Sequence, residues 1–337
     1  MVPIRFSKAL NIYRFAHAAI GVCTAVVILN GMSGASAQIF PSKPIQIIVT
    51  VSAGGSIDTI ARSIAEELSK SVGQPVLVEN RPGANGNIAA AAVARAAADG
   101  YTLLATGGST LNLNPHLYKT LPFDSIKSFA PITITARTNL ILVVHPKLNV
   151  DSLEAFITLA KSRPGKLNYG SAGSGSLIHI ASELFDAAAG VETSHVPYKG
   201  LAPAVNDLLA GQIDFMFDSA TTMSHIKAGK LRALAVVGPN PLSALPELKT
   251  LARHGIKGME SAAGWHGLLA PAGTPAAVIA RLHSETMKIL AMEKIRDRIV
   301  ALGAEPASSR PEELATLIAR DIERLGPVVR KTGATLD

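Results

Sequence analysis

The chain has 337 residues and a formal net charge of +7; 48% of its residues are hydrophobic, 17% are charged and 4% are aromatic. This length exceeds what one hydrophobic core usually serves, so we expect two domains. The chain has few aromatic side chains and no long block of Lys and Arg, which argues against a nucleic-acid partner.

The first 37 residues predict a signal peptide. Three basic residues precede an apolar run at residues 15–29, and the small-residue sequence ASA follows and ends at Ala37. This order is typical of secretory signal peptides, and the apolar run is shorter than the roughly 20 residues of a membrane-spanning helix. We therefore expect export to the periplasm with cleavage near Ala37, in preference to a transmembrane anchor. Cleavage would also remove Cys23, the only cysteine.

Further along the chain, short apolar runs rich in β-branched residues alternate with helical patterns. The predicted elements, in chain order, are a strand at 44–51, a helix from Ser56 through Leu68, a strand at 75–80, a helix at 88–99, strands at 101–106 and 139–146, a helix at 151–161, a strand at 166–170, a helix at 177–190 closed by Gly190, a helix with Pro203 near its start, strands at 213–219 and 231–238, and mostly helix from Pro275.

The repetition of strand, glycine-rich loop and helix is typical of α/β proteins with mainly parallel sheets and flanking helices. In such sheets a ligand lies beyond the carboxyl ends of the strands. Three loops at that position, at residues 52–56, 107–110 and 171–176, consist only of Gly, Ser, Thr and Ala. They are the first candidate ligand site.

Motifs for cofactors, metals and nucleophiles are missing from the sequence. It lacks G-x-G-x-x-G, the phosphate loop, the G-x-S-x-G elbow and any histidine spacing typical of zinc sites. We therefore expect no cofactor and no metal. A Ser/His/Asp set that assembles in space stays open.

The glycine loops fit a carboxylate. Helix N-termini present unpaired N–H donors and a partial positive charge, so they bind anions without a cationic side chain. The alternative is that each glycine only permits a tight turn. Three similar loops at equivalent places favour the ligand interpretation.

Three further residues have two interpretations each. Asp58 interacts favourably with a helix dipole or accepts a ligand hydrogen bond, and Asp218 lines a cleft or caps a turn. Tyr198 is a candidate wall of the site, and Lys199 is a cation near the ligand or a solvated loop lysine. His179, between apolar neighbours, is expected to be a packed or surface histidine, and Trp265 to pack near a domain junction.

Several long motifs in order resemble the Bug receptors, the solute-binding receptors of tripartite tricarboxylate transporters. The motifs are AGGSIDTIARSIAEELSKSVGQPVLVENRPGANGNIAA, KLNYGSAGSGS, HVPYKG, DLLAGQIDFMFD, IKAGKLRALAV and GLLAPAGTP. The resemblance extends over nearly all of the chain after the signal peptide. It implies a periplasmic binding protein of two α/β domains with a ligand cleft between them, the first domain at 38–138 plus 265–337 and the second at 139–264.

The resemblance also implies the residues that hold a carboxylate, through backbone amides and waters. They are Ser52, Ala53, Gly54, Gly55, Ser56, Asp58, Thr106, Gly107, Gly108, Ser109, Ser171, Ala172, Gly173, Ser174, Gly175, Ser176, Tyr198, Lys199, Gly200 and Asp218. One departure is that Ser52 and Ala53 replace prolines that the family commonly has before the two glycines.

We therefore expect an exported, non-catalytic and monomeric receptor. It would capture a small carboxylate by closure of two domains and present it to membrane transporter subunits or to a sensor protein. The alternative is a periplasmic hydrolase or isomerase that acts on a small organic acid.

Overall fold

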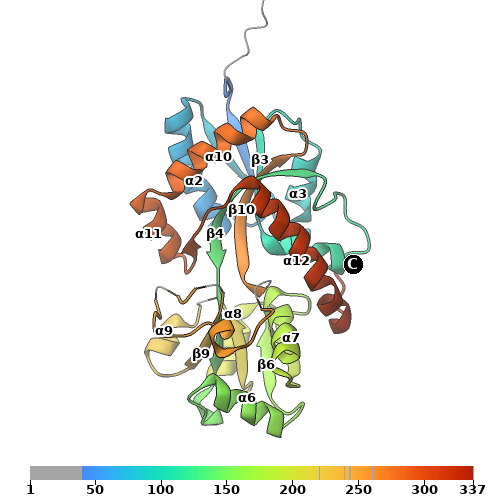
Figure 1. The fold of residues 1–337 in the computed structure, drawn as a ribbon, viewed down its shortest axis with the longest axis vertical. Helices are drawn as coiled ribbons and strands as arrows, with labels where there is room; N and C mark the ends of the chain where they lie inside the picture. The colour runs from blue at the N-terminus through green and yellow to red at the C-terminus, as the bar shows by residue number, and fades with distance from the viewer. Residues whose placement is uncertain (1–39, 220, 239, 243, 260–261, 337) are drawn as a thin grey trace, which may run out of the picture. The chain divides into compact units, whose positions relative to one another are not determined.

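We describe the fold from a computed structural model of the chain (Figure 1). The structure describes residues 40–219, 221–238, 240–242, 244–259 and 262–336. The predicted signal peptide therefore lies outside the described residues. The chain divides into two compact units, Met1–Ser42 and Lys43–Asp337, and the following concerns the second unit. Among its described helices, none combines the length and the apolar character that crossing a membrane requires.

One sheet, which we call sheet A, has the strand order β11-β4-β10-β3-β1-β2 among the described residues. Its strands are β1 (Ile45–Val49), β2 (Val76–Asn80), β3 (Thr102–Gly107), β4 (Phe129–Thr138), β10 (Gly264–Pro271) and β11 (Glu305–Pro306). Strand β1 is parallel to β2 and β3, β10 is antiparallel to β3 and β4, and β11 is antiparallel to β4. Because β1 and β3 are parallel neighbours, the loops that follow them share one edge of the sheet.

Helices cover both faces of sheet A, because alternate side chains of a strand point to opposite faces. Ile48 and Leu104 pack with α3 (Asn87–Ala94) and the first half of α12 (Pro311–Thr332). The neighbouring strand residues Ile47 and Ala105 face α2 (Ser56–Val72), whose apolar side chains recur at helical spacing. Helices α10 (Ala276–Leu290) and α11 (Glu293–Ala301) contact α2, and Figure 1 shows these three helices on the side of the sheet opposite α12.

The other sheet, sheet B, has the order β7-β6-β8-β5-β9. Its strands are β5 (Leu140–Val144), β6 (Asn168–Ser171), β7 (Ser194–Pro197), β8 (Phe215–Asp218) and β9 (Arg232–Val237). Its core has two layers. Leu142 and Phe215 pack with α6 (Leu153–Ser162) and α7 (Leu177–Ala189), while Ile141 and Met216 pack with α8 (Leu201–Leu209). The rings of Phe156 and Phe215 meet edge to face at 5.0 Å.

The structure confirms the predicted two-domain α/β class but corrects the strand directions. Strand β6 is parallel to β7 and β8, whereas β5 is antiparallel to β8 and β9. Both sheets are therefore mixed and not mainly parallel. The chain passes directly between the sheets at two places. A single residue, Asn139, joins β4 of sheet A to β5 of sheet B, and β10 of sheet A follows the last strand of sheet B. These strands therefore run opposite to the parallel strands of their sheets. The domain limits at 138/139 and 264/265 stay a prediction.

The strands that were not predicted include β4 and β10, and one helix is shorter than expected. β4 contains Pro131 and several threonines, and β10 contains Gly264 and Gly267, so neither has the apolar run that predicts a strand. The helix expected at 88–99 ends at Ala94, because alanine favours a helix but does not by itself maintain one. The C-terminus of α7 is as predicted, with Gly190 in the left-handed conformation at φ 63°.

Candidate carboxylate-binding site

The predicted site residues lie at five junctions between a strand and the following helix. These junctions follow β1, β3, β6, β7 and β8, and the next helices are α2, α4 (Gly108–Asn112), α7, α8 and α9 (Met223–Lys227). Each of these strands has a parallel neighbour, so the loops lie at the carboxyl edge of sheet A or of sheet B. This is the edge where α/β proteins bind ligands.

Two amides of the loop after β1 donate hydrogen bonds within the loop and to the first turn of α2. Gly54 has φ 87°, and its N–H donates to Asp58 Oδ2 at 2.8 Å, while the Gly55 N–H donates to Ser52 O at 3.4 Å. Helix α2 then begins at Ser56 without a side-chain cap. The first N–H groups of a helix have no intrahelical partner, so the donors offered to a ligand are those of the first turn, from Ser56 onward.

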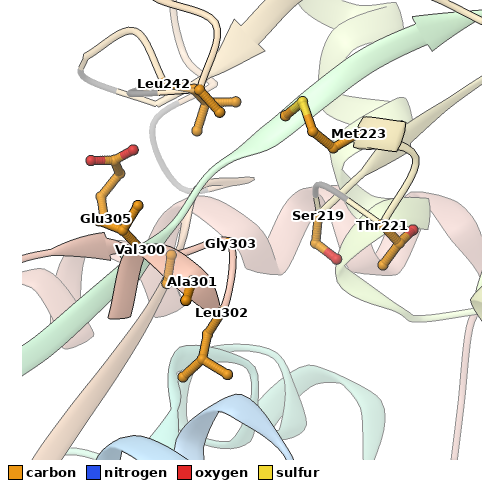
Figure 2. Close-up of a pocket in the computed structure, with 11 residues that line it drawn as sticks. Ser219, Thr221, Met223, Leu242, Val300, Ala301, Leu302, Gly303 and Glu305 are labelled. Atoms are coloured by element: carbon orange, nitrogen blue, oxygen red, sulfur yellow. The ribbon is translucent and has the colours of Figure 1, made fainter. Parts of the chain in front are cut away.

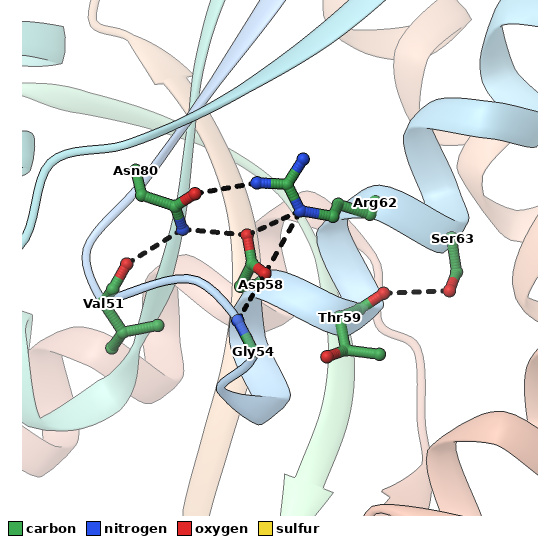
Figure 3. A network of polar contacts seen from close by, with 7 residues as sticks. All are labelled: Val51, Gly54, Asp58, Thr59, Arg62, Ser63 and Asn80. Carbon is green, nitrogen blue, oxygen red and sulfur yellow. Dashed lines mark hydrogen bonds and ion pairs between the residues drawn. The ribbon is translucent and has the colours of Figure 1, made fainter.

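Asp58 shapes this loop through a network of polar contacts (Figure 3). Its carboxylate is buried and accepts hydrogen bonds from Gly54 N, Arg62 Nε at 3.1 Å and Asn80 Nδ2 at 2.8 Å. Burial alone raises the pKa of Asp58, but the hydrogen bonds from Arg62, Gly54 and Asn80 outweigh it and hold the pKa below its usual value. The contacts show Asp58 as a residue that forms the loop. Arg62 and Asn80 were not predicted, although an Arg four residues after an Asp on a helix is a usable signal.

The loop after β3 packs tightly against β10. Thr106 is fully buried and donates to Gly107 O, and Thr110 donates to Asn85 O. A Cβ added to Gly108 would lie 2.7 Å from Trp265 Nε1. Only a residue without a side chain therefore fits under the indole of Trp265, which is buried at the start of β10. Ser109 is half-buried on α4.

The loop after β6 is closed by its own hydrogen bonds. Gly173 and Gly175 have φ 120° and 76°. Gly173 N donates to Ser171 Oγ at 3.1 Å, Gly175 N donates to His179 Nδ1 at 3.0 Å, and Ser176 Oγ caps α7 by accepting from His179 N. Ala172 is half-buried and Ser174 exposed, and their amides make no hydrogen bond among the described residues.

The remaining candidates lie after β7 and β8. Tyr198 Oη donates to Asp207 at 2.7 Å, and burial together with this contact raises the pKa of Tyr198 to about 12. Lys199 is exposed, and Gly200 has φ 115° at the N-terminus of α8.

Asp218 is fully buried at the end of β8. It accepts from Thr222 N and Thr222 Oγ1, both at 2.8 Å, and from the hydroxyl of Thr221. It therefore caps the turn before α9, the second of the two roles considered for it.

Some of these loops meet and others do not. Within sheet A, Ile57 lies against Gly107, and within sheet B, Tyr198 N donates to Ser171 O at 3.1 Å. Between the sheets, Gly108 and Ser109 line a small cavity together with Leu177, the first residue of α7. Within the described part of the chain, the hydrogen bonds of Gly54, Gly55 and Asp218 stay within their own loop and the following turn.

A larger cavity of about 340 Å³ lies beside this edge (Figure 2). Ser219 and Thr221 after β8 line one side, and the turn from α11 to β11, with Val300 and Leu302, lines the other. Its lining is mainly apolar and includes no Lys, no Arg and none of the glycine loops. This lining includes no cationic side chain that would favour an anion.

A serine and a histidine do assemble in space, as the sequence left open. Ser171 Oγ lies 2.7 Å from His195 Nε2. However, Ser171 is fully buried and its hydroxyl also contacts Gly173 O at 3.0 Å. Among the described residues no carboxylate hydrogen-bonds to His195, and no group of three or more His, Cys, Asp and Glu is arranged to hold a metal. The pair has the contacts of a structural hydrogen bond and not those of an activated nucleophile.

Comparisons with known proteins agree with this architecture. The structure of the periplasmic binding protein BugD is similar, with 33% sequence identity, a TM-score of 0.67 and coverage of 88% of this chain and 99% of that chain. Rpa4515 of R. palustris, solved with adipate, has 34% identity and a TM-score of 0.71, covering 88% of this chain and 100% of that chain. MatC of Rhodopseudomonas palustris, solved with bound malate, has 31% identity and a TM-score of 0.66, covering 86% of this chain and 100% of that chain.

The family itself follows from a match over most of the chain. Residues 60–334 match the model of the tripartite tricarboxylate transporter family receptor. Together with the similarity to BugD, this match confirms the predicted resemblance to Bug receptors. The chain therefore belongs to the receptor family of the tripartite tricarboxylate transporters.

Proposed function

We propose that this chain is an exported, non-catalytic receptor that binds a small dicarboxylate at the strand-end loops of its two sheets. The observation that carries the proposal is the position of five loops at the carboxyl edges, where helices α2, α7 and α8 begin. Their N-terminal amides supply the donors that a carboxylate needs. The structures of Rpa4515, solved with adipate, and of MatC, solved with bound malate, support this class of ligand.

The site residues divide into two groups in this proposal. The amides and hydroxyls of the loops contact the ligand, with Tyr198 and Lys199 at its side; these loops contain Ser52, Ala53, Gly54, Gly55, Ser56, Thr106, Gly107, Gly108, Ser109, Ser171, Ala172, Gly173, Ser174, Gly175, Ser176 and Gly200. Asp58 and Asp218 hold loops in place, because their oxygens are already used by neighbouring donors. Replacing them changes the shape of the site without removing a ligand contact.

The cellular setting follows from the family. The protein is exported to the periplasm after cleavage near Ala37, is monomeric, and presents its ligand to membrane subunits of a transporter or to a sensor. The two domains at 38–138 plus 265–337 and at 139–264 close on the ligand, since hinge closure brings loops of both sheets to one molecule.

The first test is binding itself. Mass spectrometry of the native, purified protein should identify a co-purified carboxylic acid, and a thermal-shift screen should rank adipate, malate and dicarboxylates of neighbouring chain length. A ligand at 100 times its Kd adds about 2.7 kcal/mol to the free energy of unfolding. Matched diamines and dimethyl esters of the same chain length serve as controls and should give no shift. Equal shifts with the esters would contradict an amide-based carboxylate site.

The second test separates the receptor from the alternative hydrolase or isomerase. Prolonged incubation with the bound acid, or with its esters, should return the compound unchanged. A new product that disappears in a Ser171→Ala variant would favour catalysis by the Ser171–His195 pair and overturn the receptor proposal.

A further inference from the structure

Two histidines stack beneath the loop at residues 171–176. The ring centroids of His179 on α7 and His195 on β7 are 3.8 Å apart with an interplanar angle of 10°, and Tyr169 on β6 stacks on His195 at 4.9 Å. His179 is 4% exposed. His195 was not among the predicted site residues.

Each imidazole contacts the loop directly. The Gly175 N–H donates to His179 Nδ1 at 3.0 Å, and His195 Nε2 lies 2.7 Å from Ser171 Oγ. Ser171 Oγ in turn accepts from the Gly173 N–H at 3.1 Å. His179 thus holds Gly175, and His195 holds Ser171, whose hydroxyl holds Gly173, so the amides of Gly173 and Gly175 are already used. The amides of Ala172 and Ser174 remain for a ligand.

This arrangement requires a neutral His179. A ring nitrogen that accepts an N–H carries no proton, so His179 is the neutral tautomer with its proton on Nε2. A proton on Nδ1 would face the Gly175 N–H and break the contact. Two imidazolium rings 3.8 Å apart would also repel each other strongly in a buried site.

The surrounding charges do not compensate a protonated pair. Glu183 on α7 accepts from Tyr169 Oη at 2.9 Å and lies 3.6 Å from Lys331 on α12, so its charge is already shared. Asp186, also on α7, is occupied by Thr193. Burial lowers the pKa of both histidines, that of His195 to about 4, with the neighbouring His179 contributing to the second shift.

We propose that His179 and His195 are positioning residues of the carboxylate site: as neutral rings they fix the 171–176 loop so that its free amides point outward to the ligand, and protonation of His179 releases the loop. The expected effect on ligand affinity rests on the proposed function. The hydrogen bond from Gly175 N–H to His179 Nδ1, which we call the clamp, is a property of the chain alone. It predicts a receptor that loses affinity in acid through its loop, before its core unfolds.

The clamp is tested without ligand. In the ¹⁵N-glycine-labelled full chain after export, the Gly175 amide resonance should shift as pH falls from 7.5 to 4, together with the His179 ring nitrogens. His179→Phe keeps an aromatic ring but removes the acceptor, so the Gly175 amide should exchange with solvent at least tenfold faster. His179→Asn places an oxygen near the position of Nδ1 and should restore slow exchange.

A control histidine makes the same kind of contact elsewhere. His145 Nδ1 accepts the Lys147 N–H at 3.1 Å, at the end of sheet B away from the candidate loops. His145→Phe should leave the Gly175 amide unchanged. Unchanged Gly175 exchange in His179→Phe, or a Gly175 shift that does not follow the titration of His179, would overturn the clamp.

The effect on binding is measured with adipate and malate by calorimetry. For an acid that binds the parent chain, His179→Phe should weaken binding about tenfold at pH 7.5. After correction for protonation of the acid itself, His179→Phe and His179→Asn should bind with little pH dependence, and His145→Phe should match the parent. Parent-like affinity and pH dependence in His179→Phe would overturn the positioning role. If the parent binds neither acid, the proposed function fails, and the amide measurement alone decides the clamp.

Discussion

Asp58 and Asp218 are buried carboxylates that fix two of the candidate loops through hydrogen bonds. Asp58 lies in the first turn of the helix after β1, and Asp218 lies at the end of β8. The oxygens of both accept hydrogen bonds from backbone and side-chain donors. A carboxylate that is already saturated in this way repels an anion less than a free one, and in the proposed site it fixes the loop amides that would bind the ligand. Both residues were predicted as site residues. The partners of Asp218, Thr221 and Thr222, are close in sequence, whereas Asn80, a partner of Asp58, is contributed by the neighbouring strand β2 and was not predictable from the local pattern.

Asp186 and His195 have pKa values shifted in opposite directions. Asp186 is 6% exposed and one of its oxygens has no partner among the described residues. Burial raises its pKa from 3.8 to about 6, so the stability that it contributes is complete below pH 3.8 and is lost as pH rises through 6. Burial lowers the pKa of His195 from 6.5 to about 4, so its contribution is complete above pH 6.5 and is lost as pH falls through 4.

The loss of stability from Asp186 with rising pH and the gain of stability from His195 should nearly cancel in the parent chain between about pH 4.5 and 6.5. Asp186→Asn removes one of them, and the free energy of unfolding of the variant should then rise with pH by about 2 kcal/mol more than that of the parent over this window. Urea unfolding at several pH values measures the difference. Asp151→Asn, at an exposed aspartate, is the control. Parallel profiles for the parent and Asp186→Asn would show that Asp186 is ionised throughout.

The strands and helices were predictable to different extents. Runs such as IQIIV at β1 and FMFD at β8 are apolar and followed by glycine or polar residues, so both the strand and the loop after it were predicted. β4 and β10 escaped prediction because threonine and proline interrupt the pattern of β4 and glycine interrupts that of β10, and the buried Thr133 of β4 forms hydrogen bonds of its own. The same two strands set the mixed direction of sheet A. The loop positions were therefore predictable, whereas the hydrogen bonds that close each loop depend on residues far apart in the sequence.

The junction between β3 and α4 gives a test at this scale. Gly108 lies so close to Trp265 that an added Cβ would be 2.7 Å from Nε1, whereas a Cβ on Gly107 would meet only the movable tip of Ile57 at 3.2 Å. Gly108→Ala should lower the free energy of unfolding by about 1–3 kcal/mol, because overpacking forces the ring or the loop to move. Gly107→Ala should cost less than half as much. Trp265 is the only tryptophan, so its fluorescence reports on the junction directly; an unchanged spectrum and stability in Gly108→Ala would show that β10 moves freely away.

For the molecule as a whole, helices α7 and α12 connect the two sheets. Ile180 of α7 packs with Leu325 and Val329 of α12 in one buried cluster, and Lys331 lies 3.6 Å from Glu183. Leu117 of α5 (Asn114–Leu117) lies against the Gly175 position of the loop. The loop after β6 is thus held by groups that belong to both parts of the fold, while the hydrogen bonds of Gly54 and Gly55 stay within their own loop and the first turn of α2. This asymmetry makes the two loops respond differently to a ligand.

Hydrogen exchange with and without the co-purified acid should reveal that difference. A ligand that joins the two sheets must protect amides in residues 52–58 and 171–178 together, because each loop supplies donors and neither can close the site alone. The larger change is expected in 52–58, whose exposed loop gains its first contacts beyond sheet A, and the smaller in 171–178, which its histidines and Leu117 already restrain. Peptides from α6 and α10, away from the loops, should not change. Protection confined to 171–178 would place the ligand on sheet B alone, and the proposed closure of two domains around it would then be wrong.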